Sequence, residues 1–158
     1  MAAALVPFAV GVNAPAFADF SGRVVGVSDG DTIKVLHDGK AEKIRLYGVD
    51  CPEKGQAFGA KAKQFTSEMV FGKTVTLHVT DTDRYGRTVA DVILPGGRVL
   101  NRELVAAGLA WWYRKYSTDE SLKQLEADAR TARRGLSPIP PPALPPITAP
   151  VGDEPNSH

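Results

Sequence analysis

The chain has 158 residues, of which 43% are hydrophobic and 23% are charged, and its formal net charge is +1. This length and composition fit one globular domain with a hydrophobic core and do not favour two domains. A net charge this close to zero excludes a strongly basic nucleic-acid coat protein, so any contact with a polyanion has to be local. Because Cys51 is the single cysteine, an intrachain disulfide is also excluded.

The first 18 residues differ from the rest of the chain because they contain no charged side chain, and residues 5–12 are almost entirely apolar. Ala16-Phe17-Ala18 has the small-x-small pattern of a signal-peptide cleavage site before Asp19, although no Lys or Arg precedes the apolar run. The alternative is an apolar arm that stays attached to the domain. The segment is too short to span a bilayer. We therefore expect a signal-peptide-like segment over residues 1–18 and a secreted or periplasmic protein.

Short runs of β-branched residues predict five strands, over residues 23–27, 32–36, 42–46, 73–80 and 88–94. Turn dipeptides separate the first three runs, and Asp38-Gly39 is typical of a β-hairpin. The turn at Pro95-Gly96-Gly97 is expected to follow the fifth strand.

Three helices are expected between and after these strands. The first covers residues 56–71, with Phe58, Ala62, Phe65 and Met69 on one face. The second begins with Asn101 as its N-cap and ends at Gly108, and the third follows Ser117-Thr-Asp-Glu120, which has the spacing of a capping box.

The predicted domain, residues 19–136, is therefore α+β and mainly β. Five short strands with a helix after the third favour a small closed barrel of the OB type, with three helices packed beside it. Such barrels often bind nucleic acid. The proline-rich composition of residues 137–158 predicts an extended or disordered tail.

Three carboxylates lie next to the second and third predicted strands, which the Asp38-Gly39 turn would join in a hairpin. Asp31 comes just before the second predicted strand, and Asp50 and Glu53 come just after the third. If these strands form a hairpin, the carboxylates converge at one rim, where a hard divalent cation would offset their repulsion. The Cys51 carbonyl, held outward by Pro52, is a further candidate ligand. The alternative is that Asp29, Asp31 and Asp50 are turn residues that cap their own backbone.

Two arginines accompany the carboxylates, and guanidinium groups suit bidentate contact with phosphate. Arg45 lies in the third predicted strand, on the face opposite Ile44 and Leu46, where the alternative is a simple solvent-facing position. Arg87 follows Tyr85-Gly86 in a predicted turn, and a tyrosine beside arginines suits base stacking with phosphate binding. Carboxylates and arginines together suggest metal-assisted phosphodiester cleavage.

The chain resembles the staphylococcal nuclease (thermonuclease) family over about residues 21–135. Four motifs carry the resemblance and occur in order: Asp29-Gly-Asp-Thr-Ile33, Arg45-Leu-Tyr-Gly-Val-Asp-Cys-Pro-Glu53, Thr82-Asp-Arg-Tyr-Gly-Arg87 and Leu104-Val-Ala-Ala-Gly-Leu-Ala110. The resemblance implies an OB-fold phosphodiesterase, a calcium-dependent endo- or exonuclease of the micrococcal-nuclease type. Its substrates would be DNA and RNA, and its products would carry 3′-phosphate and 5′-hydroxyl ends.

The same resemblance implies a role for each matching residue. Asp31 and Asp50 would bind calcium through their carboxylates and Cys51 through its carbonyl. Glu53 would position or deprotonate the attacking water, and Arg45 and Arg87 would grip the scissile phosphate. The remaining contacts would be those of Arg84 and Tyr85 with the terminal phosphate region, and of one or both of Tyr113 and Tyr116 with a base. No stable membrane insertion and no obligate protein partner are expected, and the protein is expected to be a monomer.

The chain departs from the family's type member at two places in particular. Cys51 stands where the type member has threonine, which predicts sensitivity of the site to oxidation. The pair Trp111-Trp112 has no counterpart, and core or rim packing is favoured over base stacking.

Two other functions stay open. One is a non-catalytic module that binds nucleic acid or protein on the same fold, and the other is a calcium-stabilised interaction module without turnover.

Overall fold

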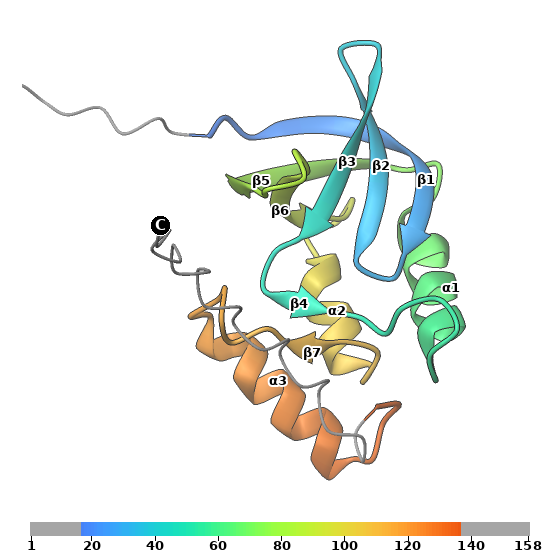
Figure 1. The fold of residues 1–158 in the computed structure, drawn as a ribbon, viewed down its shortest axis with the longest axis vertical. Helices are drawn as coiled ribbons and strands as arrows, with labels where there is room; N and C mark the ends of the chain where they lie inside the picture. Colours follow the sequence, from blue (N-terminus) through green and yellow to red (C-terminus); the bar gives the residue numbers. More distant parts are fainter. Residues whose placement is uncertain (1–16, 137–158) are drawn as a thin grey trace, which may run out of the picture.

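The computed structural model describes residues 17–136. The proline-rich segment and most of the signal-peptide-like segment lie outside this range. Five strands form a closed barrel in the order β1-β2-β3-β6-β5, with β5 pairing back to β1 (Figure 1). The predicted barrel with three helices is therefore confirmed.

The barrel strands are β1 (Phe20–Asp29), β2 (Thr32–His37), β3 (Lys40–Leu46), β5 (Thr74–Thr82) and β6 (Thr88–Ile93). Asp38 and Gly39 both have positive φ, 47° and 76°, so the predicted hairpin turn joins β2 and β3 in the geometry that such a dipeptide favours. All neighbouring strands are antiparallel except β3 and β6, which are parallel and place Arg45 opposite Val89.

A second, two-stranded sheet was not predicted. It pairs β4 (Val49–Asp50) with β7 (Trp111–Trp112), and Figure 1 shows it between the barrel and α3. The sheet ties the segment that follows β3 to the segment that follows α2.

The helices are α1 (Gly59–Val70), α2 (Leu100–Ala106) and α3 (Glu120–Thr131). Figure 1 shows α1 at one side of the barrel and α2 between the barrel and α3. The barrel and α2 share one core, whose largest completely buried side chains include Ile33, Ile44, Leu77, Leu100 and Leu104.

Three predicted helix details are wrong. The first helix begins at Gly59 and not near residue 56, because the Glu53 carbonyl accepts the Gln56 N–H in a turn before it. The N-cap of α2 is Val99, and Asn101 instead lies completely buried in the first helical turn. The N-cap of α3 is Asp119, whose carboxylate accepts the Ser121 N–H at 2.9 Å.

No helix within residues 17–136 is both long enough and apolar enough to cross a membrane.

Candidate active site

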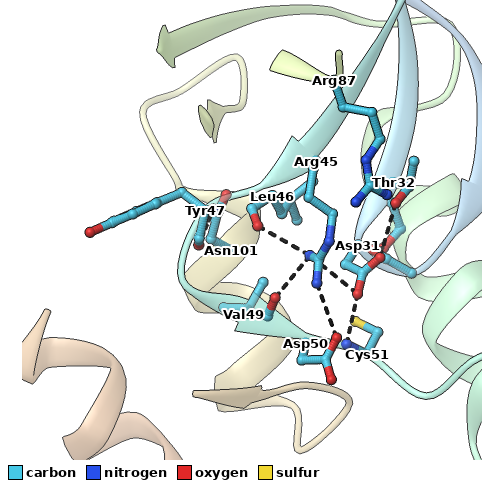
Figure 2. Close-up of polar contacts among 12 residues, drawn as sticks. Asp31, Thr32, Arg45, Leu46, Tyr47, Val49, Asp50, Cys51, Arg87 and Asn101 are labelled. Carbon is cyan, nitrogen blue, oxygen red and sulfur yellow. Dashed lines mark hydrogen bonds and ion pairs between the residues drawn. The ribbon is translucent and has the colours of Figure 1, made fainter. Parts of the chain in front are cut away.

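One rim of the barrel collects residues from three separate segments. Asp31 ends the turn between β1 and β2, Arg45 lies in β3 opposite Thr32, and Asp50 lies in β4. Figure 2 shows the Arg45 guanidinium between the two carboxylates. The predicted convergence of Asp31 and Asp50 is therefore present, and one arginine joins them.

Four oxygen atoms hold the Arg45 guanidinium in place. Nη1 is 3.2 Å from Asp31 Oδ2, and Nη2 donates to Asp50 Oδ1 at 3.0 Å. Nη1 also donates to the carbonyls of Leu46 and Val49, at 3.2 and 2.8 Å. With 15% of its side chain exposed, Arg45 does not have the solvent-facing position that was the alternative. Among the described residues no bond uses Nε, so this donor stays available to a ligand.

Asp31 is buried, and both oxygens of its carboxylate accept hydrogen bonds within the rim. Oδ2 accepts the Cys51 N–H at 2.8 Å in addition to Arg45, and Oδ1 accepts the Thr32 hydroxyl at 3.0 Å. The bond to Cys51 spans 20 positions in the sequence, so Asp31 is not a residue that caps its own turn. Its position depends on α1, because the Thr66 hydroxyl donates to the Gly30 carbonyl at 2.6 Å.

A side chain at position 30 would disturb this arrangement. A Cβ atom added to Gly30 would lie 2.7 Å from Ala62 Cβ and 2.9 Å from Cys51 Sγ, which is too close for carbon and sulfur atoms. The glycine before Asp31 therefore lets α1 and the Cys51 segment pack directly beneath the rim.

Asp50 carries an unfavourable charge in this site. Desolvation by burial raises the pKa of its carboxyl, and the negative charges of Asp31 and Glu53 raise this pKa further, while Arg45 lowers it. Burial is the main cause of the raised pKa, and the effect of Arg45 is larger than that of either neighbouring carboxylate. An additional cation at this rim would relieve the remaining repulsion.

Cys51 contributes its backbone to the rim and keeps its thiol inside. The residue is 5% exposed, and burial together with the nearby Asp31 raises the pKa of the thiol well above its usual value. A buried thiol that stays protonated is a poor nucleophile. Burial of the thiol argues against the predicted sensitivity of the site to oxidation, which stays a prediction.

Glu53 lies on the exposed loop between β4 and α1. Its backbone N–H donates to Gln56 Oε1 at 2.8 Å. Among residues 17–136 its carboxylate has no hydrogen-bond or ion-pair partner. Its negative charge is nevertheless close enough to Asp50 to raise the pKa of the Asp50 carboxyl. The structure thus places a free carboxylate near the rim and leaves both of its predicted roles open.

The turn between β5 and β6 brings the second arginine to the rim. Asp83 organises this turn, because its Oδ1 accepts the backbone N–H groups of Tyr85 and Arg87, and its Oδ2 accepts Arg87 Nε at 2.6 Å. Figure 2 shows the Arg87 side chain pointing toward Thr32 and Asp31. Neither Arg87 Nη atom has a partner among the described residues, so both are available to an anion.

Three tyrosines were predicted as substrate contacts, and the structure places one beside the arginines of the β5–β6 turn and pairs the other two with each other. The Tyr85 ring is 68% exposed and lies 4.8 Å from the Arg84 guanidinium and 5.5 Å from that of Arg87. Tyr113 and Tyr116 lie together, with ring centroids 4.8 Å apart, and the Tyr113 N–H donates to the Gly48 carbonyl at 2.8 Å. This last bond ties the tyrosine pair to the loop that leads to Asp50.

The sequence matches the family described as "Staphylococcal nuclease homologue" over residues 43–137. The chain belongs to the staphylococcal nuclease family. An "Uncharacterized endonuclease" of Escherichia coli is 45% identical over 128 residues, which cover 78% of this chain and 84% of that protein. A "Micrococcal nuclease" of Shigella flexneri is 42% identical, with coverage of 79% and 78%. A "Thermonuclease" of Staphylococcus hyicus is 36% identical, with coverage of 72% and 73%. Family and relatives together support nuclease, and hence hydrolase, activity.

Calcium is the ion that resemblance to the staphylococcal nuclease family implies, and the residues of the rim can be tested against it. Within residues 17–136 no group of three or more His, Cys, Asp and Glu side chains has the arrangement of a metal site. The rim does supply two converging carboxylates, those of Asp31 and Asp50, which lie on either side of Arg45. Hard cations accept carboxylate, backbone and water oxygens together. The donor set therefore fits a hard cation that completes its coordination with water and substrate.

Two buried residues outside the predicted site, Trp111 and Glu126, support the site of this nuclease. Trp111 is 7% exposed, in agreement with the predicted packing role, and its strand pairs directly with Asp50. Glu126 in α3 is also 7% exposed, and its Oε1 accepts the Trp112 N–H at 3.2 Å. In sequence, Glu126 looks like the solvent-facing acidic residues around it in a mostly polar helix. The one signal for its burial is its helical spacing, which places it on the same face as Leu122 and Ala129.

Proposed function

We propose that this protein is a calcium-dependent nuclease that hydrolyses phosphodiester bonds of DNA and RNA and leaves 3′-phosphate and 5′-hydroxyl ends. The observation that carries the proposal is the Arg45 guanidinium, held between Asp31 and Asp50 at 3.2 and 3.0 Å, with the free Nη atoms of Arg87 beside them. Carboxylates for a cation and guanidinium groups for a phosphate occupy one rim. Family membership supports the same reaction class.

The two arginines would stabilise the charge that builds on the phosphate in the transition state. Arg45 has Nε available and is fixed by four oxygen atoms, so that little reorganisation is required when the phosphate arrives. Arg87 is fixed through Nε by Asp83, which leaves its terminal nitrogens to form two parallel hydrogen bonds.

A calcium ion bound by Asp31, Asp50 and the Cys51 carbonyl would neutralise the phosphate and polarise its P–O bonds. The free carboxylate of Glu53 would orient the attacking water or accept its proton. As the new P–O bond forms, the bond to the 5′ oxygen breaks, and this oxygen takes up a proton to become the 5′-hydroxyl. The phosphate stays on the 3′ oxygen of the preceding nucleotide.

The test uses the full chain and a single-stranded DNA, and in parallel an RNA, that carries a fluorophore and a quencher. We expect cleavage with calcium and none in excess EGTA. Arg87→Ala should lower kcat about 100- to 1,000-fold, the effect of removing one preorganised donor to developing charge. Asp31→Asn, which keeps an oxygen for the Cys51 N–H, should abolish the calcium-dependent activity.

Arg98→Ala is the matched control for the arginine variant. Arg98 is exposed and pairs with Glu103 outside the site, so its removal changes the net charge equally and should leave cleavage unchanged. Undiminished cleavage in EGTA would contradict the calcium mechanism. A folded, calcium-binding protein that cleaves neither nucleic acid would instead support one of the two non-catalytic modules.

We also propose that the protein is exported, either to the periplasm or beyond the cell. Support comes from the uncharged, apolar residues 1–18 and from the anchoring of the chain directly afterwards. The Asp19 carboxylate accepts the Val79 N–H at 3.1 Å and pairs with His78 on β5. Asp19, the residue that a cleavage after Ala18 would leave as the new amino terminus, is thus anchored to the barrel.

A further inference from the structure

A second hollow lies between α1 and the segment that follows α2, and it shares no residue with the rim of the nuclease site. Its volume is about 320 Å³, and its apolar walls are Phe58, Phe65, Ala107 and Leu109. Exposed polar side chains of α1 form its edge, namely Lys61, Gln64 and Glu68. One N–H of the Gln64 amide donates to Glu68 Oε1 at 2.9 Å, and the other is available to a ligand. We call this hollow the α1–α2 groove. Concave sites with aromatic walls and a few polar groups are typical of ligand-binding surfaces.

One wall of the groove is held in an unusual backbone conformation. Phe58 has φ 66° and ψ −2°, the left-handed region that a bulky residue rarely occupies, and it is the N-cap of α1 without a side-chain cap. Such strain persists only where surrounding structure enforces it, and it is frequent at binding sites. The Phe58 ring lies 5.7 Å from the Lys61 amino group, which keeps a donor at the edge of the aromatic wall.

The described chain ends at this groove. Gly135 contributes to its lining, and the next residue, Leu136, is 3% exposed and donates its N–H to the Gly108 carbonyl at 2.7 Å. Leu136 is thus fixed against the end of α2. Residues 137–158 follow two positions after Gly135 in the sequence, and a segment tethered so close to the groove has a high effective concentration for it.

The composition of the tail matches the groove. Residues 137–152 carry no charge and hold seven prolines, which favours polyproline II structure with three residues per turn. In that helix one face would carry only apolar residues, namely Pro138, Pro141, Leu144, Ile147 and Pro150. Prolines lack an N–H, so the carbonyls of such a segment seek external donors. Aromatic-lined grooves with donors at the edge bind segments of this kind.

We propose that the α1–α2 groove is the docking site for the proline-rich tail of the same chain, through the face formed by Pro138, Pro141, Leu144 and Ile147. Phe58 and Phe65 pack against this face, and Lys61 and Gln64 donate to the tail's carbonyls. Docking would also brace the first turn of α1, which directly follows the loop that carries Glu53.

The experiment is paramagnetic broadening in the full chain. A spin label on Ala143→Cys lies off the docking face, and the buried Cys51, with its raised thiol pKa, does not compete for the reagent. We expect selective loss of most of the amide signal intensity at residues 61–68 and 107–109, while the hairpin around residues 37–40 keeps its signals.

Two sets of tail substitutions separate the docking face from the rest of the tail. Pro141→Ser, Leu144→Ser and Ile147→Ser together should abolish the selective broadening. Ile139→Ser, Pro142→Ser and Pro145→Ser should preserve it, although this set also replaces three apolar residues and removes one proline more. Equal effects of the two sets, or broadening without selectivity, would overturn the proposal.

A mixed sample distinguishes the chain's own tail from that of a second copy. Spin-labelled protein without isotopes is combined with isotope-labelled protein without a spin label. Absence of broadening in this sample supports docking within one chain. Broadening that appears only in this sample would assign the groove to the tail of another molecule and would overturn the proposal as stated.

Discussion

Arg45 illustrates how a single residue can organise a site before substrate arrives. Its guanidinium is fixed by Asp31, Asp50 and two backbone carbonyls, and its remaining Nε donor stays available among the described residues. Fixed donors stabilise developing charge without the reorganisation that free side chains or water would require. The carboxylates that fix Arg45 are also those proposed to hold the cation, so phosphate and cation positions are coupled through one side chain.

Asp50→Asn tests whether the site sacrifices stability for function. Burial, Asp31 and Glu53 raise the pKa of the Asp50 carboxyl in the folded protein. The folded state therefore binds this proton more tightly than the unfolded state, so the contribution of Asp50 to stability falls as the pH rises through the window between the two pKa values. At neutral pH, in EGTA, we expect Asp50→Asn to raise Tm by a few degrees, because the amide oxygen still accepts from Arg45.

The gain should shrink as the pH is lowered, since the wild-type carboxyl then becomes protonated, and calcium-dependent cleavage should be lost at every pH. The measurement is thermal unfolding across a pH series. Asp128→Asn is the control, because Asp128 is exposed on α3 and its carboxylate accepts a hydrogen bond only from Gln124 among the described residues. A lower Tm for Asp50→Asn at neutral pH would show that the ion pair with Arg45 outweighs desolvation.

At the scale of elements, the predicted strands and hairpin agree with the structure, whereas the helix caps and the pairings of distant segments do not follow from the sequence. The β2–β3 hairpin could be predicted because Asp38-Gly39 fixes its turn locally. The parallel pairing of β3 with β6 and the two-residue β4–β7 sheet have no local signal, because their partners lie about 40 to 60 positions apart in the sequence. Asn101 was read as a helix cap for the same reason: an asparagine before an apolar run looks like a cap whatever its tertiary partners are.

Asn101→Ala tests the role that the structure gives this residue. The side chain is completely buried, its Nδ2 donates to the Tyr47 carbonyl at 2.9 Å, and its Oδ1 accepts the Val92 N–H at 3.0 Å. It therefore joins α2 to β6 and to the loop that leads from β3 to Asp50. Alanine leaves two backbone groups without these partners, at about 1–3 kcal/mol each.

We expect Asn101→Ala to lower the free energy of unfolding by roughly 2–4 kcal/mol in urea titrations with an unchanged m value. Arg102→Ala, one position further on an exposed part of the helix, should change it by less than about 1 kcal/mol. A loss as small as that of the control would mean that water replaces the bonds of Asn101.

Across the whole molecule, the site depends on barrel closure and on the second sheet at once. Asp31 and Arg45 belong to neighbouring barrel strands, Arg87 reaches the same rim because β6 pairs with β3, and Asp50 is held by β7. The sequence motifs were sufficient to name these residues as candidates. They did not reveal that Arg45 joins both aspartates or that the Cys51 thiol faces inward, because both facts depend on how separate segments pack.

The proposed export of the protein leads to a prediction about its amino terminus. Asp19 pairs with His78 and accepts the Val79 N–H, so the domain keeps its first anchor if residues 1–18 are removed. When the full chain is produced in a bacterium with a secretion system, we expect the periplasmic or released form to begin at Asp19, as measured by intact mass and amino-terminal sequencing. Ala18→Arg is the matched variant, because a large charged residue at the cleavage position blocks processing without altering the anchor. It should accumulate with residues 1–18 still attached. Recovery of the wild-type protein from the cytoplasm with this segment intact would instead favour the apolar arm.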